Sequence, residues 1–256
     1  MIGIPNPWPG CLIAFEGMDG SGKSVQMKTA EHMIQGLDLS RRSVVLTKEP
    51  NKEGPWGARI YAELAKSAGI HLTDPLRFQT WYAAGSREHV RDTVIPALQA
   101  GHIVLTDRCR LSMVYGITNW NQDFCELIQM HWGVIGEYFI WPDAIFVFDV
   151  PVAVALERLS KKGISLDAHE RESVLTRVGS NYRTISWMVS NCHLVDGNRG
   201  TGVVFGSYGR IISDLLVNNF PECRDFIEGR AELWNFVGLS RLGWKEKNNA
   251  SKVASI

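Results

Sequence analysis

The sequence predicts an α/β fold in which a doubly wound, parallel, five-stranded sheet carries helices on both faces. Short apolar runs rich in β-branched and aromatic residues alternate with longer segments of helical period. These runs are apolar at nearly every position, as are strands that a parallel sheet buries on both faces. The chain has 256 residues, of which 45% are hydrophobic and 21% charged, a composition typical of a globular domain with a large core.

Five short apolar runs are the predicted strands, and they are Cys11–Glu16, Ser43–Thr47, His102–Thr106, Ala144–Asp149 and His193–Asp196. The segments between and after them repeat apolar residues with helical spacing, and they are Lys23–Leu37, Gly57–Ser67, Trp81–Gln99, Asp123–Tyr138, Val152–Lys162, Glu172–Ser190 and Tyr208–Asn218. Ligands of such sheets bind outside the carboxyl ends of the strands. The residues that directly follow each strand are therefore the candidates for a functional site.

Charge and cysteine content disfavour several classes of protein. The 27 Lys and Arg residues balance 27 Asp and Glu residues, so the overall charge favours neither nucleic acid nor an anionic membrane. The five cysteines include no Cys-x-x-Cys pair, which indicates reduced thiols rather than a zinc site. No secretory signal and no apolar run long enough to span a bilayer is found. We expect a protein without a membrane partner, in the cytoplasm of a cell or of an infected host cell.

One domain is expected over residues 1–219, because no repeat or low-complexity block interrupts the first 218 residues. Residues 220–256 form a predicted carboxyl-terminal extension. It contains Trp234, Phe236 and Trp244 and ends in a polar stretch. We expect residues 220–244 to pack on the domain and the last dozen residues to be frayed.

The strongest motif lies directly after the first predicted strand and directly before the first predicted helix. It fits the phosphate-loop pattern Gly-x4-Gly-Lys-[Ser/Thr] and consists of Gly17, Met18, Asp19, Gly20, Ser21, Gly22, Lys23 and Ser24. The glycines let backbone N–H groups point inward, and the helix amino terminus adds positive potential. Lys23 is expected to neutralise β- and γ-phosphate oxygens, and Ser24 to hold Mg²⁺. The sequence therefore predicts a site for a nucleoside triphosphate with Mg²⁺.

A phosphate loop is shared by motors, GTPases, helicases and kinases, so other signals must separate them. The GTPase signature Asn-Lys-x-Asp is absent, and a single phosphate loop excludes a tandem-domain helicase. Asp107 and Arg108 directly follow the third predicted strand. A carboxylate there can hold Mg²⁺ through water, and an arginine can contact an acceptor or the transferring phosphoryl group. We therefore expect Lys23, Asp107, Arg108 and Asp19 to be the catalytic residues.

From about Cys11 to Leu216 the chain resembles the thymidylate kinase family. The segments that carry the resemblance occur in the family's order, and they are Phe15–Gln26, Thr47–Pro50, Tyr82–Ala84 with Glu88 and His89, Ile95–Leu98, Asp107 and Arg108, Pro142 and Asp143, Phe148–Pro151, and Ala155–Leu159. The resemblance implies a P-loop fold of the nucleoside monophosphate kinase type. It also implies transfer of the γ-phosphate of ATP to a thymidine-like pyrimidine deoxynucleotide, with Mg²⁺, in a protein that is usually a homodimer.

The resemblance also implies roles for further residues. Asp19 would lie near the acceptor sugar or the metal, and Tyr82 would stack on a pyrimidine ring. Glu49 and Arg108 would line the acceptor pocket with it, and Arg158 would contact ATP. A lid over about 163–170 would close over ATP, with positive charge from the flanking residues Lys161, Lys162 and Arg171.

Departures from the family's pattern cluster on the acceptor side. With His89 and Pro96 aligned, Ser86 stands where the family has an arginine that binds the acceptor phosphate. Arg87 follows one position later and can replace that arginine if the helix register shifts. Cys109 stands in place of the tyrosine of an Asp-Arg-Tyr motif.

Three functions therefore remain open. The first is phosphorylation of a free deoxynucleotide, dTMP to dTDP above all. The second is phosphorylation of the hydroxyl of 5-hydroxymethyluracil within DNA, as in viral synthesis of modified bases, for which tryptophans could stack a flipped-out base. The third is ATP binding without catalysis, against which the intact Lys23, Ser24, Asp107 and Arg108 argue.

Overall fold

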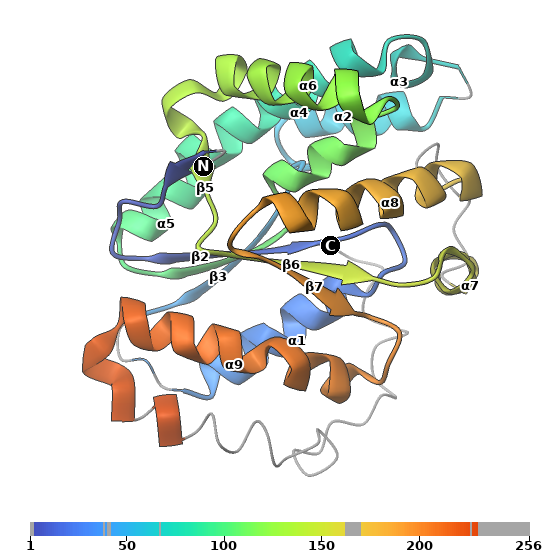
Figure 1. The fold of residues 1–256 in the computed structure, drawn as a ribbon. Coiled ribbons are helices and arrows are strands. Elements are labelled where there is room, and N and C mark those ends of the chain that lie inside the picture. Colours follow the sequence, from blue (N-terminus) through green and yellow to red (C-terminus); the bar gives the residue numbers. More distant parts are fainter. Residues whose placement is uncertain are drawn as a thin grey trace.

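The computed structural model describes residues 3–37, 39, 42–66, 68–161, 170–225 and 227–229. At its centre lies a five-stranded parallel sheet in the order β3-β4-β2-β6-β7 (Figure 1). The strands are β2 (Cys11–Glu16), β3 (Val44–Lys48), β4 (Ile103–Asp107), β6 (Ala144–Asp149) and β7 (Cys192–Asp196). This confirms the predicted fold class, with each strand boundary within one residue of its prediction. Two short strands that the sequence did not predict, β1 (Ile4–Pro5) and β5 (Ile140–Trp141), form a separate parallel pair.

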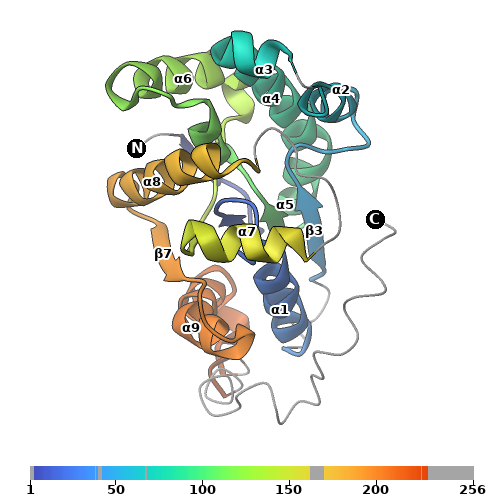
Figure 2. The same cartoon turned by 90° about the vertical axis from the view of Figure 1, so that its right-hand side faces the viewer.

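Helices cover both faces of the sheet. The α-helices are α1 (Lys23–Gln35), α2 (Pro55–Leu64), α3 (Ile70–Thr73), α4 (Pro75–His89), α5 (Ile95–Gln99), α6 (Trp120–Ile135), α7 (Val152–Ser160), α8 (Glu172–Met188) and α9 (Thr201–Asn219). Helices α1 and α9 lie on one face, and α4, α5 and α8 lie on the other (Figure 1). Helix α7 lies across the carboxyl ends of the strands, which face the viewer in Figure 2. The sheet is therefore closed on both faces, and its carboxyl edge is where a ligand can enter.

The register of the central strands brings the ends of three strands level. Phe15 of β2 pairs with Asp107 of β4, and Asp107 pairs with Lys48 of β3. All six residues of β2 are buried, as expected for the middle strand of the sheet. The phosphate loop, Arg108 and Glu49 therefore leave the sheet side by side.

The predicted helix Trp81–Gln99 is divided in the structure. Helix α4 begins six residues earlier, at Pro75, and a π-helical segment, Val90–Val94, separates it from α5. Pro96 has no N–H to donate to the preceding turn, and the winding changes directly before it. Helix α9 also begins earlier than predicted, at Thr201.

The first residues of the predicted extension pack on the domain. Phe220 and Ile227 are 1% and 0% exposed and join the core cluster beneath α1 and α9. The rest of the extension, from residue 230, lies outside the described residues, as do residues 162–169 with most of the predicted lid. Among the helices that the structure describes, none combines the length and the apolar character that a membrane span needs.

Candidate active site

The phosphate loop between β2 and α1 adopts backbone conformations that only glycine takes readily. Gly17 has a φ of 134° and Gly20 a φ of 80°. A Cβ atom at Gly17 would lie 2.6 Å from the carbonyl oxygen of Phe148, and one at Gly20 would lie 2.4 Å from that of Ala155. The loop therefore passes close to β6 and α7, with no room for a side chain at either glycine.

Lys23 and Arg108 share one carboxylate of the phosphate loop. The Lys23 Nζ atom lies 3.3 Å from Asp19 Oδ1, and Arg108 Nη2 lies 2.7 Å from the same oxygen. Tyr115 donates its hydroxyl to Asp19 Oδ2 over 3.0 Å. Burial opposes ionisation of Asp19, but Arg108 and Lys23 hold its pKa well below the usual range. Two cations thus lie where the phosphates of a nucleotide would meet the loop.

Ser24 and Asp107 fit the magnesium site that the sequence predicts. The Ser24 hydroxyl donates to Asp107 Oδ2 over 2.5 Å. Asp107 Oδ1 is buried, and no donor in the described part of the chain reaches it. A hydroxyl beside a carboxylate with a free oxygen suits Mg²⁺, which takes a few protein oxygens and completes its shell with phosphates and water.

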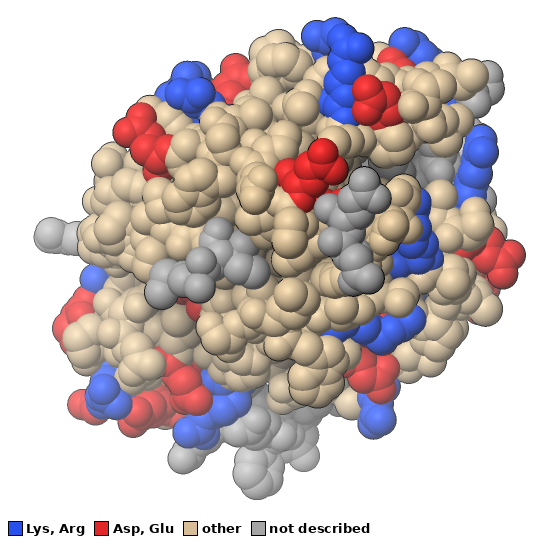
Figure 3. Space-filling view, turned by 45° about the horizontal axis from the view of Figure 1, so that its top comes forward, with Lys and Arg blue, Asp and Glu red and all other residues tan. Residues whose placement is uncertain are grey.

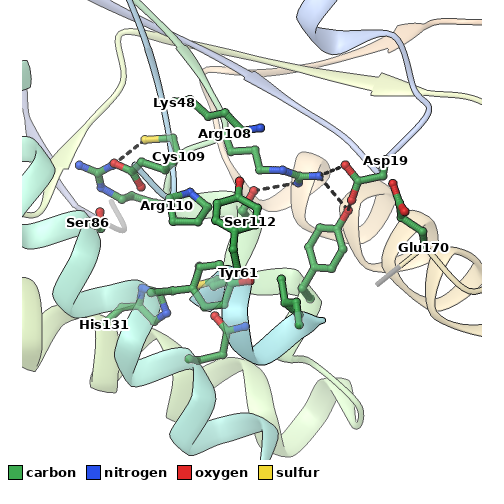
Figure 4. Close-up of a pocket in the computed structure, with 17 residues that line it drawn as sticks. Asp19, Lys48, Tyr61, Ser86, Arg108, Cys109, Arg110, Ser112, His131 and Glu170 are labelled. Atoms are coloured by element: carbon green, nitrogen blue, oxygen red, sulfur yellow. Dashed lines mark hydrogen bonds and ion pairs between the residues drawn. The ribbon is translucent and has the colours of Figure 1, made fainter. Parts of the chain in front are cut away.

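Glu16 holds the segment that carries Arg108. Arg108 has a left-handed backbone conformation, with a φ of 73°, and no other non-glycine residue in the described part of the chain has a positive φ. The Glu16 carboxylate accepts 2.8 Å hydrogen bonds from the Cys109 N–H and from the Ser112 and Tyr182 hydroxyls. Burial raises the pKa of Glu16, while these donors and Arg108 act in the opposite direction. The strained backbone is thereby fixed, and the Arg108 side chain points at Asp19 (Figure 4).

A cavity of about 230 Å³ opens beside the phosphate loop. In Figure 4, Asp19 and Glu170 lie at one end and Arg110, Ser86 and His131 at the other. Three tyrosine side chains, Tyr61, Tyr82 and Tyr115, also line it. The cavity therefore extends from the phosphate loop to a buried polar end, with aromatic rings available along its wall.

Arg110 lies at the buried end and forms an ion pair with Glu49. Its Nη1 atom lies 2.8 Å from Glu49 Oε1, which also lies 3.1 Å from His89 Nδ1. Burial would raise the pKa of Glu49, but Arg110 and the hydrogen bond from His89 lower it to about 2. The pair is ionised at neutral pH.

The predicted acceptor-side residues separate into two groups. Glu49, Tyr82 and Arg108 line the cavity. Arg87 does not: its Nη1 atom donates to the Val134 carbonyl oxygen over 3.4 Å, and its guanidinium lies 5.6 Å from the centre of the Tyr138 ring. The structure thus directs Arg87 towards α6.

On the ATP side, Arg158 donates to the carbonyl oxygens of Gly20 and Ser21, over 3.4 and 3.2 Å, and so supports the phosphate loop from α7. Met18 is buried in the core. Lys161 forms an exposed ion pair with Glu157. Arg171 precedes α8 and is exposed, whereas Lys162 lies outside the described residues.

Arg110, Tyr61 and His131 are among the cavity residues that the sequence analysis does not predict. A signal for Arg110 existed, because it is a charged residue that opens the otherwise uncharged segment Arg110–Gly116. That segment forms a 3-10 helix that the sequence did not predict, and this helix sets the direction of the side chain. Tyr61 and His131 come from α2 and α6 and gave no signal beyond their helical positions.

Comparison with known proteins agrees with this geometry. The sequence model of the family described as thymidylate kinase matches residues 15–205. A thymidylate kinase of Geobacter sulfurreducens is 32% identical over 221 residues, which cover 83% of this chain and 99% of the relative. One of Thermosipho melanesiensis is 29% identical over 210 residues, covering 80% and 98%. The resemblance stated from the motifs is confirmed: the chain belongs to the thymidylate kinase family and is an ATP-dependent kinase.

Proposed function

We propose that the protein transfers the γ-phosphate of ATP to dTMP and so forms dTDP and ADP. The observation that carries the proposal is that Asp19 of the phosphate loop lines the same cavity as Tyr82 and Glu49. An acceptor in this cavity would have one end at the loop, where the γ-phosphate of ATP would lie. The two relatives named above are thymidylate kinases, and the match to this chain covers nearly the whole length of each. This likeness supports dTMP as the acceptor.

The chemistry assigns a task to each group at the loop. An oxygen of the acceptor phosphate attacks the γ-phosphorus, and the bond from that phosphorus to the ADP oxygen breaks. The protein needs to align the two reactants and to stabilise negative charge on the transferring group. Lys23 and the loop N–H groups would hold the β- and γ-phosphates, and Arg108 would hold the acceptor phosphate beside them. Mg²⁺, held through Ser24 and Asp107, would neutralise phosphate charge.

Surface features favour a free nucleotide over a base within DNA. A strand-binding surface needs a basic groove and aromatic platforms. In the face shown in Figure 3, positive and negative groups are interspersed. None of the tryptophans in the described part of the chain lines the cavity, and Trp187, which is 86% exposed, borders a separate groove beside β7.

Transfer of labelled γ-phosphate from ATP to a set of acceptors tests the proposal. The set contains dTMP, dUMP, 5-hydroxymethyl-dUMP, dCMP and an oligonucleotide with 5-hydroxymethyluracil. We expect label on dTMP. Label on the oligonucleotide alone would replace the proposal by DNA modification, and ATP binding without transfer to any acceptor would indicate a non-catalytic protein.

A further inference from the structure

The buried end of the cavity holds an arginine with unused hydrogen-bond donors. Arg110 is 3% exposed, and its Nη1 atom contacts Glu49 Oε1 and Cys109 Sγ, each over 2.8 Å. Its Nε and Nη2 atoms are also buried, and neither forms a hydrogen bond with any residue in the described ranges of the chain. A buried donor without an acceptor costs about 1–3 kcal/mol, and more when it is charged. This end of the cavity therefore needs a ligand atom that accepts hydrogen bonds.

The surroundings of Arg110 suit a neutral ligand group. Glu49 is ionised and balances the charge of Arg110. His131 also lines this end, and burial, together with the nearby Arg110, lowers its pKa to about 4, so its ring is neutral at pH 7. An anionic phosphate would gain little net attraction here. A carbonyl oxygen would satisfy the Arg110 donors without adding a charge.

The position of the phosphate loop decides which part of the acceptor reaches Arg110. The phosphate of the acceptor must lie at the loop, beside Arg108, so the base points to the opposite end of the cavity. In a pyrimidine nucleotide, position 4 of the ring lies opposite the nitrogen that carries the sugar. The substituent at position 4 is therefore the group that extends deepest.

We propose that Arg110 recognises the acceptor base by donating to the carbonyl oxygen at position 4, and thereby selects 4-oxo over 4-amino pyrimidines. The inference rests on the proposed function. A cytosine base would place an amino group against the guanidinium, so that donors would face donors and both would lose their partners. Glu49 fixes the guanidinium, and His89, whose Nε2 atom lies 2.5 Å from Thr47 Oγ1, fixes Glu49.

Ser86 offers an independent check of the geometry. It lies on α4, is 6% exposed and lines the same end of the cavity as Arg110. Its hydroxyl faces Glu49. An arginine at position 86 would therefore enter the same end of the cavity from α4, and the doubly substituted S86R/R110A protein would carry the guanidinium on α4 in place of the 3-10 helix.

The test compares kcat/KM for dTMP and dCMP in the unsubstituted protein and in Arg110→Met. We expect kcat/KM for dTMP to fall about 10–100-fold, as for loss of one good polar contact to a base, with little change for dCMP and for the KM of ATP. Arg91→Met is the matched control, because Arg91 is exposed and pairs with its neighbour Asp92. We expect S86R/R110A to recover part of the preference for dTMP.

Three results separate the possibilities. An equal loss for dTMP and dCMP, or no loss, would refute the role of Arg110 and leave the proposed function standing. Failure of the unsubstituted protein to phosphorylate any free nucleotide would refute both. If Arg110→Met does not fold because Glu49 is left buried and unpaired, Arg110→Lys keeps the charge but loses the planar guanidinium, and the same fall in the dTMP-to-dCMP ratio is expected from it.

Discussion

Lys23→Ala is expected to remove catalysis while leaving the fold intact. Lys23 is 6% exposed, and its ammonium lies 3.3 Å from Asp19 at the mouth of the phosphate loop. There it would meet negative charge that develops on the transferring phosphoryl group in a site from which water is largely excluded. Removal of one such pre-oriented donor costs on the order of 10²–10³ in kcat, or about 3–4 kcal/mol. Since Lys23 is charged, we expect kcat to fall by about 10³-fold.

The stability of Lys23→Ala should change little. Burial lowers the pKa of Lys23, and the positive charge of Arg108 acts in the same direction, so the ammonium is held at some cost. Asp19 keeps its 2.7 Å ion pair with Arg108 after the substitution. We expect the free energy of unfolding, from urea titration followed by circular dichroism, to change by no more than about 1 kcal/mol.

Lys28→Ala is the matched control, because Lys28 lies on the same helix and is exposed. Both variants are assayed for phosphoryl transfer from ATP to dTMP at saturating substrates. A Lys23→Ala protein that retains kcat within about threefold of the unsubstituted enzyme would refute the assignment of the ATP site. So would an equal loss in Lys28→Ala.

Three further predictions concern the framework of the site. Gly20→Ala should lower the free energy of unfolding by more than about 2 kcal/mol and weaken ATP binding in calorimetry, because position 20 has a φ of 80° and the new Cβ would lie 2.4 Å from the Ala155 carbonyl oxygen. An unchanged free energy of unfolding together with unchanged ATP binding would contradict the loop geometry. His131 has a folded-state pKa of about 4 against an ordinary 6.5, so the unfolded chain binds a proton first, and the free energy of unfolding should fall by at most roughly 3 kcal/mol as the pH drops from 6.5 to 4. In His131→Gln the free energy of unfolding from urea titration should depend less on pH over that range, and an unchanged dependence would argue against the buried neutral ring. Glu16→Gln should lower kcat about tenfold or more without preventing folding, because the amide places a donor where Glu16 accepts from Ser112 and Tyr182 and so loosens the segment that carries Arg108. A Glu16→Gln protein with full kcat would show that this segment needs no such support.

The ATP side of the candidate site is the part that a sequence can indicate, because its candidate residues are adjacent in the chain or at the ends of paired strands. Gly17–Ser24 form the loop by themselves, and the level ends of β2 and β4 bring Asp107 to Ser24 over a 2.5 Å hydrogen bond. Regular strand pairing is enough to predict such a meeting.

The acceptor side could not be predicted in the same way, because it depends on tertiary packing. Arg87 can replace the missing arginine only if the register of the helix shifts, and in the structure α4 turns it towards Val134 on α6. Arg110 enters the cavity because the chain after β4 winds into a 3-10 helix, in which the Ser112 N–H donates a hydrogen bond to Glu16. Neither the rotation of α4 against α6 nor that winding leaves a periodic pattern in the sequence.

Phosphorus NMR of a mixture of the protein, ATP, Mg²⁺ and dTMP tests the central claim most directly. The account predicts that the dTMP resonance is replaced by the two coupled resonances of dTDP while ADP forms in equal amount. An unchanged dTMP resonance, with ATP either intact or hydrolysed to inorganic phosphate, would contradict the claim that the cavity beside Asp19 and Arg108 is the acceptor site of a dTMP kinase.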